Sequence, residues 1–323
     1  EKYVRQSADN ELARPTGDGI GKIEFNSNLA HLYAHFVRHT IDTSLEGLTI
    51  VYDGANGAAS SVGPEILSGL GAKVININVN PDGLNINHHC GSTHIEGLQV
   101  AVQQHNADLG IANDGDADRC LLVDEKGQVL DGDQIMLLCA LKLKEEGKLK
   151  GDTIVGTVMS NIGFHKAAEE LGMKTVSTAV GDRYVLEYMR EHNLSVGGEQ
   201  SGHVIFLDHN TTGDGMLTAV QVAALMKEKK QPLSELAGIM TKYPQVLVNV
   251  RVATKTGWED NDLIKAAIVT AEGELGDEGR VLVRASGTEP LIRVMAEGPN
   301  QEELQSLCQE IADIIGREQG LAE

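Results

Sequence analysis

The sequence has few cysteines and no long apolar run. Its four cysteines are widely spaced and form no CxxC pair, which argues against a zinc site or a disulfide framework and fits reduced thiols (Cys90, Cys120, Cys139 and Cys308). No apolar run approaches the roughly 20 residues of a membrane span, and the polar opening is unlike a signal peptide. We therefore expect a cytoplasmic protein that does not enter membranes.

Basic residues are also scarce. The sequence has 27 lysines and arginines against 47 acidic residues, giving a net charge of -20. Such a field repels nucleic acid and anionic lipid surfaces, so neither is expected as a partner. A phosphate group could still bind, but only at a local cluster of arginines and backbone amides.

Aromatic residues make up only 3% of the sequence, and 36 glycines outnumber 7 prolines. This composition is typical of α/β proteins with tight turns between strands and helices. A chain of 323 residues is too long for one ordinary core, so two or three domains are expected. The chain also lacks an initiator Met and opens without clear periodicity, so we expect that a natural N-terminal portion is missing.

Two similar α/β units are predicted, followed by a smaller α+β unit. A strand, glycine turn, helix and strand begin near residue 48, and the pattern returns about 100 residues later, near residue 153. From residue 245 the pattern changes to three strands and two helices, and a short loop at 286–290 predicts antiparallel pairing. The expected segments are 1–27 (a remnant or linker), 28–126, 127–241 and 242–323.

The strongest local signal is an acidic loop, Asp114-Gly-Asp116-Ala-Asp118-Arg119, directly after an apolar strand. Three carboxylates at alternate positions can direct several oxygens at one divalent cation. A solvated acidic turn is the simpler alternative, but the glycine and the apolar strands on both sides argue against it.

An EF-hand is a second alternative for this loop, because Glu125 would fall at position 12 of that motif. However, Arg119 stands where the EF-hand needs glycine, and residues 120–123 have the pattern of a buried strand. The pattern therefore favours Mg²⁺ over Ca²⁺, since magnesium sites use few carboxylates and leave positions for water and phosphate oxygens.

Two further motifs could bind a polar ligand. Residues 197–203, Gly-Gly-Glu199-Gln200-Ser201-Gly-His203, combine glycines with the donors and acceptors that sugar hydroxyls need, although an ordinary turn would have a similar composition. Residues 284–290 form the expected phosphate cluster, together with the nearby Arg293 (Arg284, Ser286, Gly287, Thr288 and Arg293). Arginine can bind phosphate oxygens, while the hydroxyl groups and a backbone amide complete the shell. A plain hairpin loop is the alternative.

With these three motifs in this order, the sequence resembles the α-D-phosphohexomutase superfamily over essentially its whole length. The stretches 181–184 and 210–215, together with Gln200, resemble its phosphoglucosamine mutase branch. The resemblance implies four domains, of which the first, with a reactive phosphoserine, is missing here. It also implies the interconversion of glucosamine 6-phosphate and glucosamine 1-phosphate through a bisphosphorylated sugar, for amino-sugar nucleotide and cell-wall precursor synthesis.

The resemblance also assigns roles to residues. Asp114, Asp116 and Asp118 would hold Mg²⁺, and Arg119 would neutralise the moving phosphoryl group. Glu199, Gln200 and Ser201 would bind the sugar, His203 would handle protons, and the 284–293 cluster would grip the phosphate that is not reacting. This chain alone would be inactive, and the parent enzyme could be a homodimer.

Three alternatives stay open at this point. The parent enzyme could act on mannose or glucose phosphates. The chain could be a non-catalytic module that binds sugar phosphates, or it could bind calcium in a structural role.

Overall fold

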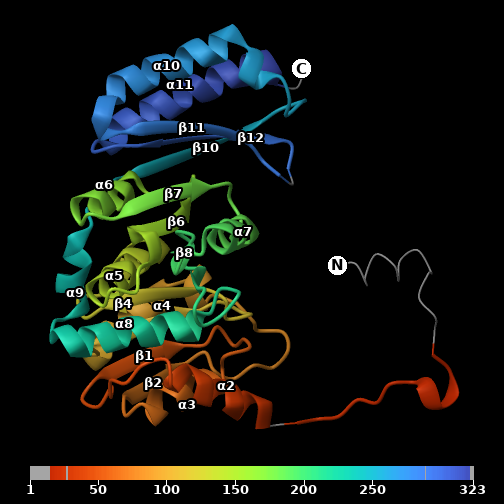
Figure 1. The fold of residues 1–323 in the computed structure, drawn as a ribbon. Coiled ribbons are helices and arrows are strands. Elements are labelled where there is room, and N and C mark those ends of the chain that lie inside the picture. Colours follow the sequence, from red (N-terminus) through yellow and green to blue (C-terminus); the bar gives the residue numbers. More distant parts are fainter. Residues whose placement is uncertain (1–14, 27, 288, 321–323) are drawn as a thin grey trace.

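The structure is a computed structural model that describes residues 15–26, 28–287 and 289–320. Figure 1 shows three sheet-containing domains stacked on one another, with the C-terminal domain at the top. The described part of the chain contains no helix that is both long and apolar enough to cross a membrane. The two similar α/β domains and the smaller α+β domain are those expected from the sequence, so the predicted fold class is confirmed.

The first domain is built on a five-stranded sheet in the order β2-β1-β3-β4-β5. Its first three strands are parallel, while β4 and β5 add antiparallel pairs. The parallel part follows from the connections through α3 and α4, because parallel neighbours need a crossover. The elements are α2 (Asn28–Arg38), β1 (Thr49–Asp53), α3 (Val62–Gly69), β2 (Lys73–Ile77), α4 (Glu96–His105), β3 (Leu109–Asn113), β4 (Cys120–Asp124) and β5 (Val129–Leu130).

The second domain repeats this plan in a four-stranded sheet, β7-β6-β8-β9. Here β7, β6 and β8 are parallel and β9 is antiparallel, so the internal repeat predicted from the sequence is confirmed. The elements are α5 (Gly132–Glu145), β6 (Thr153–Thr157), α6 (Ile162–Glu170), β7 (Lys174–Thr178), α7 (Asp182–His192), β8 (Val196–Gly198), β9 (Val204–Phe206), α8 (Gly215–Lys229) and α9 (Leu233–Leu236).

These two domains share one hydrophobic core. Helix α8 packs on β3 and β4, helix α5 packs on β6 and β8, and the two helices contact each other. The largest buried apolar cluster accordingly runs from Ile50 and Ile111 in the first sheet, through Met216, to Ile154 and Val196 in the second. Because such a core is close-packed, we expect the two domains to move as one body.

The third domain has a separate core. Its sheet has the order β10-β12-β11 with antiparallel pairing throughout, as predicted, and its two long helices pack on one side in Figure 1. Its apolar cluster includes Val246, Ile292 and Ile311 and is distinct from the core of the other domains. The elements are β10 (Gln245–Arg251), α10 (Asp262–Leu275), β11 (Arg280–Ala285), β12 (Leu291–Glu297) and α11 (Gln301–Gln319).

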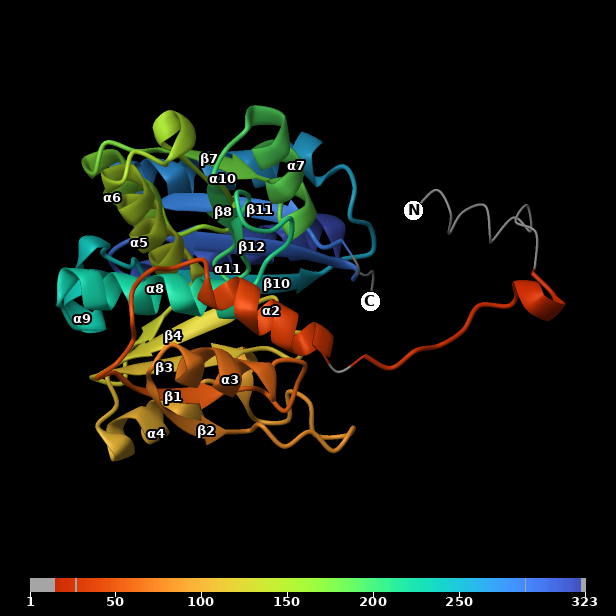
Figure 2. The same cartoon turned by 60° about the horizontal axis from the view of Figure 1, so that its bottom comes forward.

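The N-terminal segment enters the first domain through α2. Residues 15–26 extend away from the body in Figures 1 and 2, with one short helical turn at Gly17–Gly19. Most of the predicted 1–27 linker, residues 1–14 and residue 27, lies outside the described residues. Helix α2 contacts α8, and the Tyr33 hydroxyl donates a hydrogen bond of 2.7 Å to Asp214. The segment boundaries predicted near 126 and 241 stay predictions.

Asp133, at the start of α5, gives a stability prediction. The side chain is fully buried, and burial first and Asp131 second raise its pKa to about 7. The folded protein therefore holds a proton that the unfolded chain loses from about pH 4 upward, so this group removes stability as the pH rises from 4 to 7. A pKa that differs by one between the folded and unfolded states corresponds to about 1.4 kcal/mol of stability. We expect Asp133→Asn to raise the melting temperature at pH 8 and to flatten the pH dependence between pH 4 and 7.

Calorimetry of the variant and of the unmodified chain across this pH range provides the measurement. The matched control is Asp277→Asn, at an exposed position of the third domain. An unchanged pH dependence in Asp133→Asn would contradict this account of Asp133.

Candidate functional site

The acidic loop 114–119 closes the hairpin between β3 and β4. The pairing of Asn113 with Cys120 brings the two ends of the loop together, and the Asn113 side-chain amide donates a hydrogen bond of 2.8 Å to the Arg119 carbonyl. Ala117 adopts a left-handed φ of 66°, a conformation that persists only where the surroundings hold it. The structure therefore fixes the loop from both of its strands.

The three predicted aspartates are brought together. One carboxylate oxygen from each of Asp114, Asp116 and Asp118 lies within 4.8 Å of the others, and the Asp118 Oδ1 atom is buried without a hydrogen-bond partner. Burial, together with the Asp118 charge and against the opposing effect of the Arg119 backbone N–H, raises the pKa of Asp114 to about 6. Clustered carboxylates with an unsatisfied buried oxygen fit a hard divalent cation.

Arg119 turns back onto this cluster. Its Nε atom lies 3.0 Å from Asp114 Oδ2 and 3.7 Å from Asp118 Oδ1, and its side chain is 41% exposed. One edge of the guanidinium therefore offsets the acidic charge, and the rest of the side chain stays accessible to an anionic ligand.

The predicted sugar loop, between β8 and β9, contacts the acidic loop directly, although the two loops belong to different domains. Arg119 and His203 form an isolated antiparallel bridge, and the Cys120 amide donates a hydrogen bond of 3.0 Å to the Gly202 carbonyl. His203 Nδ1 lies 3.1 Å from Asp118 Oδ2. The structure therefore brings the predicted metal loop and the predicted sugar loop into one site.

One hydrogen bond and one contact with a carboxylate determine the tautomer of His203. The Gly213 amide lies 3.1 Å from Nε2 and can only donate, so Nε2 accepts and Nδ1 carries the proton toward Asp118. A Cβ at position 213 would lie 2.3 Å from Nε2, so only glycine allows this approach. His203 is 5% exposed. Both ring nitrogens are occupied, which favours a positioning role over proton transfer.

The remaining sugar-loop residues form a tight turn between β8 and β9. The Glu199 amide donates to the His203 carbonyl at 2.9 Å, and one Glu199 carboxylate oxygen accepts from the Gly181 amide at 3.0 Å. The motif at 181–184 therefore supports Glu199 from the start of α7. Gln200 is half-buried and Ser201 is exposed, so the side chains that could contact a ligand lie at the open side of the turn.

A cavity of about 560 Å³ lies beside the acidic loop. Asp116 and Asp118 form part of its wall, and the rest comes from α2, the start of α3 and residues 210–214. A group that reacts at the metal loop could enter from this side.

The predicted phosphate cluster lies at the free end of the β11–β12 hairpin. Arg284 and Arg293 are directly opposite each other across the two strands, so their side chains share one face of the sheet. Burial first, and Arg293 second, lower the pKa of the Arg284 guanidinium, while the Arg293 Nε atom is buried without a partner. A terminal nitrogen of Arg293 also lies 3.4 Å from a Glu289 carboxylate oxygen, which offsets part of this charge. The two facing cations still suit an anion bound between them.

The sequence prediction missed one cation at this cluster. Lys255 reaches over from the loop after β10, and its ammonium group donates to the carbonyls of Ser286 at 2.7 Å and Gly287 at 3.4 Å. Ser286 is buried, and its hydroxyl accepts from the Glu289 amide at 3.3 Å. Thr288 lies outside the described residues. Lys255 stands 29 residues before Arg284 without a motif of its own, so little in the sequence points to it.

The EF-hand alternative does not fit the structure. Glu125, which would have to reach the metal, points to α9 instead and accepts hydrogen bonds from the Ser234 amide and hydroxyl. Cys120–Asp124 forms the buried strand β4, as the sequence indicated.

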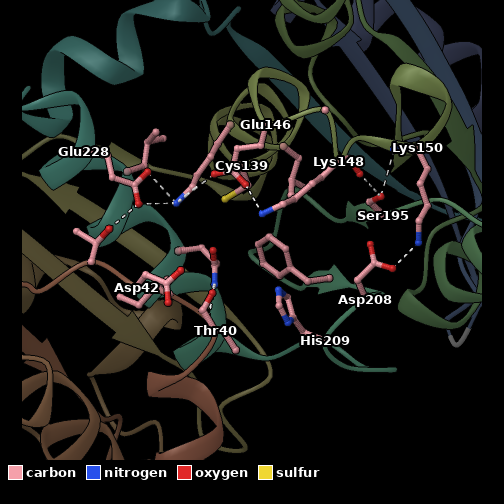
Figure 3. Close-up of a pocket in the computed structure, with 18 residues that line it drawn as sticks. Thr40, Asp42, Cys139, Glu146, Lys148, Lys150, Ser195, Asp208, His209 and Glu228 are labelled. Carbon is pink, nitrogen blue, oxygen red and sulfur yellow. Dashed lines mark hydrogen bonds and ion pairs between the residues drawn. The ribbon is translucent and has the colours of Figure 1, made fainter.

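A second cavity, of about 520 Å³, contains none of the predicted site residues (Figure 3). Ser195 and Lys150 precede strands β8 and β6, so this cavity lies at the opposite end of that sheet from the sugar loop. Several of its charged residues form ion pairs with one another, as Figure 3 shows for Lys150 with Asp208 and for Glu228 with a neighbouring lysine. This cavity is therefore separate from the site that the acidic and sugar loops form.

Comparison with protein-family models gives three matches in chain order. Residues 29–127 match phosphoglucomutase/phosphomannomutase alpha/beta/alpha domain II, residues 131–243 match alpha/beta/alpha domain III, and residues 247–314 match the C-terminal domain of the same group.

Among curated proteins, the chain is similar to several bacterial enzymes. It is 51% identical over 315 residues to the phosphoglucosamine mutase of Geobacillus thermodenitrificans, covering 98% of this chain and 70% of that protein. It is 54% identical over 306 residues to the phosphoglucosamine mutase of Desulforamulus reducens, covering 95% and 69%.

Solved structures share the fold at lower identity. A phosphoglucomutase/phosphomannomutase family protein from Burkholderia thailandensis matches with a TM-score of 0.78 at 21% identity, covering 97% of this chain and 69% of that one. The Aspergillus fumigatus N-acetylphosphoglucosamine mutase, in complex with GlcNAc-6P and magnesium, matches with a TM-score of 0.71 at 23% identity, covering 87% and 68%.

Proposed function

Because this chain belongs to the phosphoglucosamine mutase family, we propose that it forms the metal-, sugar- and phosphate-binding part of an enzyme that interconverts glucosamine 6-phosphate and glucosamine 1-phosphate. The observation that carries this proposal is the direct junction of the acidic loop with the sugar loop, through the bridge between Arg119 and His203. A phosphate clamp on a third domain supplies the other binding group.

The acidic loop is proposed to hold Mg²⁺ through Asp114, Asp116 and Asp118. The ion would neutralise charge on the phosphoryl group as it transfers, the main demand of this chemistry. Arg119 adds a positive charge beside the cluster, since part of its guanidinium stays exposed. The GlcNAc-6P and magnesium complex of the Aspergillus fumigatus protein supports the pairing of a sugar phosphate with this metal.

His203 is proposed to orient Asp118. Its Nδ1 proton faces the carboxylate while the Gly213 amide occupies Nε2, so the ring fixes the direction of one metal ligand. We propose this role in place of the proton handling that the family resemblance implied.

Glu199, Gln200 and Ser201 are proposed to hold the sugar hydroxyls and the amino group. Arg284, Ser286, Gly287, Thr288 and Arg293 would hold the phosphate that is not reacting, with Lys255 as an added cation. Binding this remote phosphate orients the reacting end of the sugar at the metal loop.

The phosphoryl group is proposed to come from a phosphoserine that this chain does not supply. The serine O–P bond would break as a sugar hydroxyl forms a new O–P bond, and the proton of that hydroxyl would end on the released serine oxygen. The reverse transfer from the other end of the sugar would restore the phosphoserine and return a proton to the sugar oxygen. This chain would then bind substrate but not turn it over. The parent protein, meaning this chain together with the segment that carries the serine, would be active.

Magnesium binding can be tested on this chain by thermal melting. A ligand at a hundredfold excess over its Kd stabilises the folded state by about 2.7 kcal/mol, so we expect Mg²⁺ to raise the melting temperature by several degrees. Asp118→Asn should remove most of this shift, and Asp277→Asn, at an exposed site in the third domain, should keep it. A shift with Ca²⁺ and none with Mg²⁺ would instead support a structural calcium site.

The sugar preference can be tested on the parent protein with four substrates. We expect the kcat/KM for glucosamine 6-phosphate to exceed those for glucose 6-phosphate, mannose 6-phosphate and N-acetylglucosamine 6-phosphate. A higher value for glucose or mannose phosphate would favour a phosphoglucomutase or phosphomannomutase. Binding of the sugar phosphate by the parent protein without any turnover would favour a non-catalytic module.

A further inference from the structure

Hydrogen bonds join the third domain to the second. The two domains have separate apolar cores, so their relative position depends on the groups at their boundary. These groups converge on Ser160, Asn161 and Ile162, at the start of α6, which we call the α6 corner. A contact of this kind can be broken without removing the core of either domain.

Glu297, at the end of β12, is the centre of this contact. It is fully buried, and its Oε2 atom accepts from the Ile162 amide at 3.0 Å and from Arg280 Nε at 2.7 Å. Its Oε1 atom accepts from the Gln245 side chain at 2.6 Å and lies 3.4 Å from the side-chain amide nitrogen of Asn161. A carboxylate at the first amide of a helix also interacts favourably with the helix dipole.

Arg280 makes a second contact with the α6 corner. While its Nε atom contacts Glu297, its terminal nitrogen donates a hydrogen bond of 2.6 Å to the Ser160 carbonyl. Asn161 adds bonds to the backbone of Tyr243, in the segment that connects the two domains. The base of the β11–β12 hairpin is therefore fixed to the second domain by charged and hydrogen-bonded groups.

The same hairpin carries the phosphate clamp at its other end. Arg280 pairs with Glu297 across the two strands, and four residues further along Arg284 pairs with Arg293. Side chains an even number of residues apart lie on one face of a strand, and four residues span about 14 Å. The anchored pair and the clamp therefore lie on one face of one arm.

We propose that Glu297 and Arg280 are positioning residues that set the approach of the phosphate clamp to the sugar and metal loops. A tilt of about 10° at the base would move the clamp by roughly 2 Å over this arm, and misplacement of about 1 Å can cost a hundredfold in rate. The inference rests on the proposed function, because it assumes a ligand that spans the sugar loop and the clamp.

Two ligands of different size can distinguish a role in positioning the clamp from a role in stability alone. Glucosamine 6-phosphate would contact both the sugar loop and the clamp, whereas inorganic phosphate would contact the clamp alone. In titration calorimetry with this chain, we expect Glu297→Gln to weaken binding of glucosamine 6-phosphate about tenfold and to leave binding of inorganic phosphate within about twofold. The matched control is Glu310→Gln, at an exposed glutamate of α11, which should bind both ligands as the unmodified chain does.

Arg280→Lys provides a second variant in case Glu297→Gln folds poorly. A lysine keeps the charge but lacks the planar guanidinium that contacts Glu297 and Ser160 at the same time. We therefore expect Arg280→Lys to lose affinity for glucosamine 6-phosphate, by less than Glu297→Gln does. Equal affinity for glucosamine 6-phosphate in the unmodified chain and in both variants would overturn the inference. An equal loss for both ligands would also overturn it, because that result indicates damage to the clamp itself.

The proposed function fails separately, if the unmodified chain binds inorganic phosphate but not glucosamine 6-phosphate. Amide hydrogen exchange at 162–170 then decides whether the anchor exists. Faster exchange in Glu297→Gln than in Glu310→Gln would support the anchor at the α6 corner. Equal exchange in the two variants would show that Glu297 does not anchor this corner.

Discussion

Replacing Asp116 by asparagine is expected to lower the mutase kcat of the parent protein by about two to three orders of magnitude, the size seen when one group that stabilises transition-state charge is removed. Asp116 is exposed, and its carboxylate clusters with those of Asp114 and Asp118. Its loss should therefore weaken the cation site with little effect on folding. Steady-state kinetics at several Mg²⁺ concentrations provide the measurement.

Asp277→Asn is the control for this experiment, because it removes one exposed carboxylate far from the acidic loop in sequence. It should leave kcat and its dependence on Mg²⁺ unchanged. If Asp116→Asn kept full activity with the same Mg²⁺ requirement, the acidic loop would not be the metal site.

Replacing Arg284 by alanine is expected to raise the KM of the parent protein for glucosamine 6-phosphate by about 10- to 100-fold, with a smaller effect on kcat. A charge-assisted bond to phosphate contributes about 1.5–3 kcal/mol, and each 1.4 kcal/mol corresponds to a factor of ten. Arg284 faces Arg293 directly, so the variant also loses a repulsion between two cations. The melting temperature without ligand should therefore stay the same or rise.

This combination of weaker binding and unchanged or higher stability is specific to a clamp. The matched control is Arg317→Ala, at an exposed arginine of α11 whose Nε atom contacts only its own helix, at the Asp313 carbonyl among the described residues. It should change neither KM nor kcat. An unchanged KM in Arg284→Ala would exclude this arginine from phosphate binding.

Much of the site could be predicted because its groups are local in sequence. Asp114, Asp116 and Asp118 occupy alternate positions of one hairpin loop, so the chain brings them together without help from other segments. The same holds for Glu199 to His203. The pattern of apolar residues likewise predicted the strands of the third domain, and the short loop at 286–290 predicted their antiparallel pairing.

The contacts that could not be predicted are those between distant segments. Lys255 reaches the carbonyls at 286 and 287 from another loop, and no motif marks it. Glu297 bonds the amide of Ile162 across 135 residues. Such contacts depend on how whole domains pack, and a single sequence carries no local pattern for them.

The role of His203 shows the same limit at one residue. The family resemblance implied that His203 would handle protons. The structure places the Gly213 amide on one nitrogen and Asp118 near the other, and this favours a ring that orients a carboxylate. Gly213, whose amide decides the role of His203, lies ten residues further along the chain, in a stretch to which the sequence assigned no function.

Formation of glucosamine 1-phosphate from glucosamine 6-phosphate tests the central claim most directly. The assay compares the parent protein with Mg²⁺, the parent protein with EDTA, and this 323-residue chain with Mg²⁺. We expect turnover only in the first case, with glucosamine 6-phosphate bound but unchanged in the third. Equal turnover in EDTA, or turnover by this chain alone, would contradict a mechanism in which the acidic loop binds the metal and a separate phosphoserine supplies the phosphoryl group.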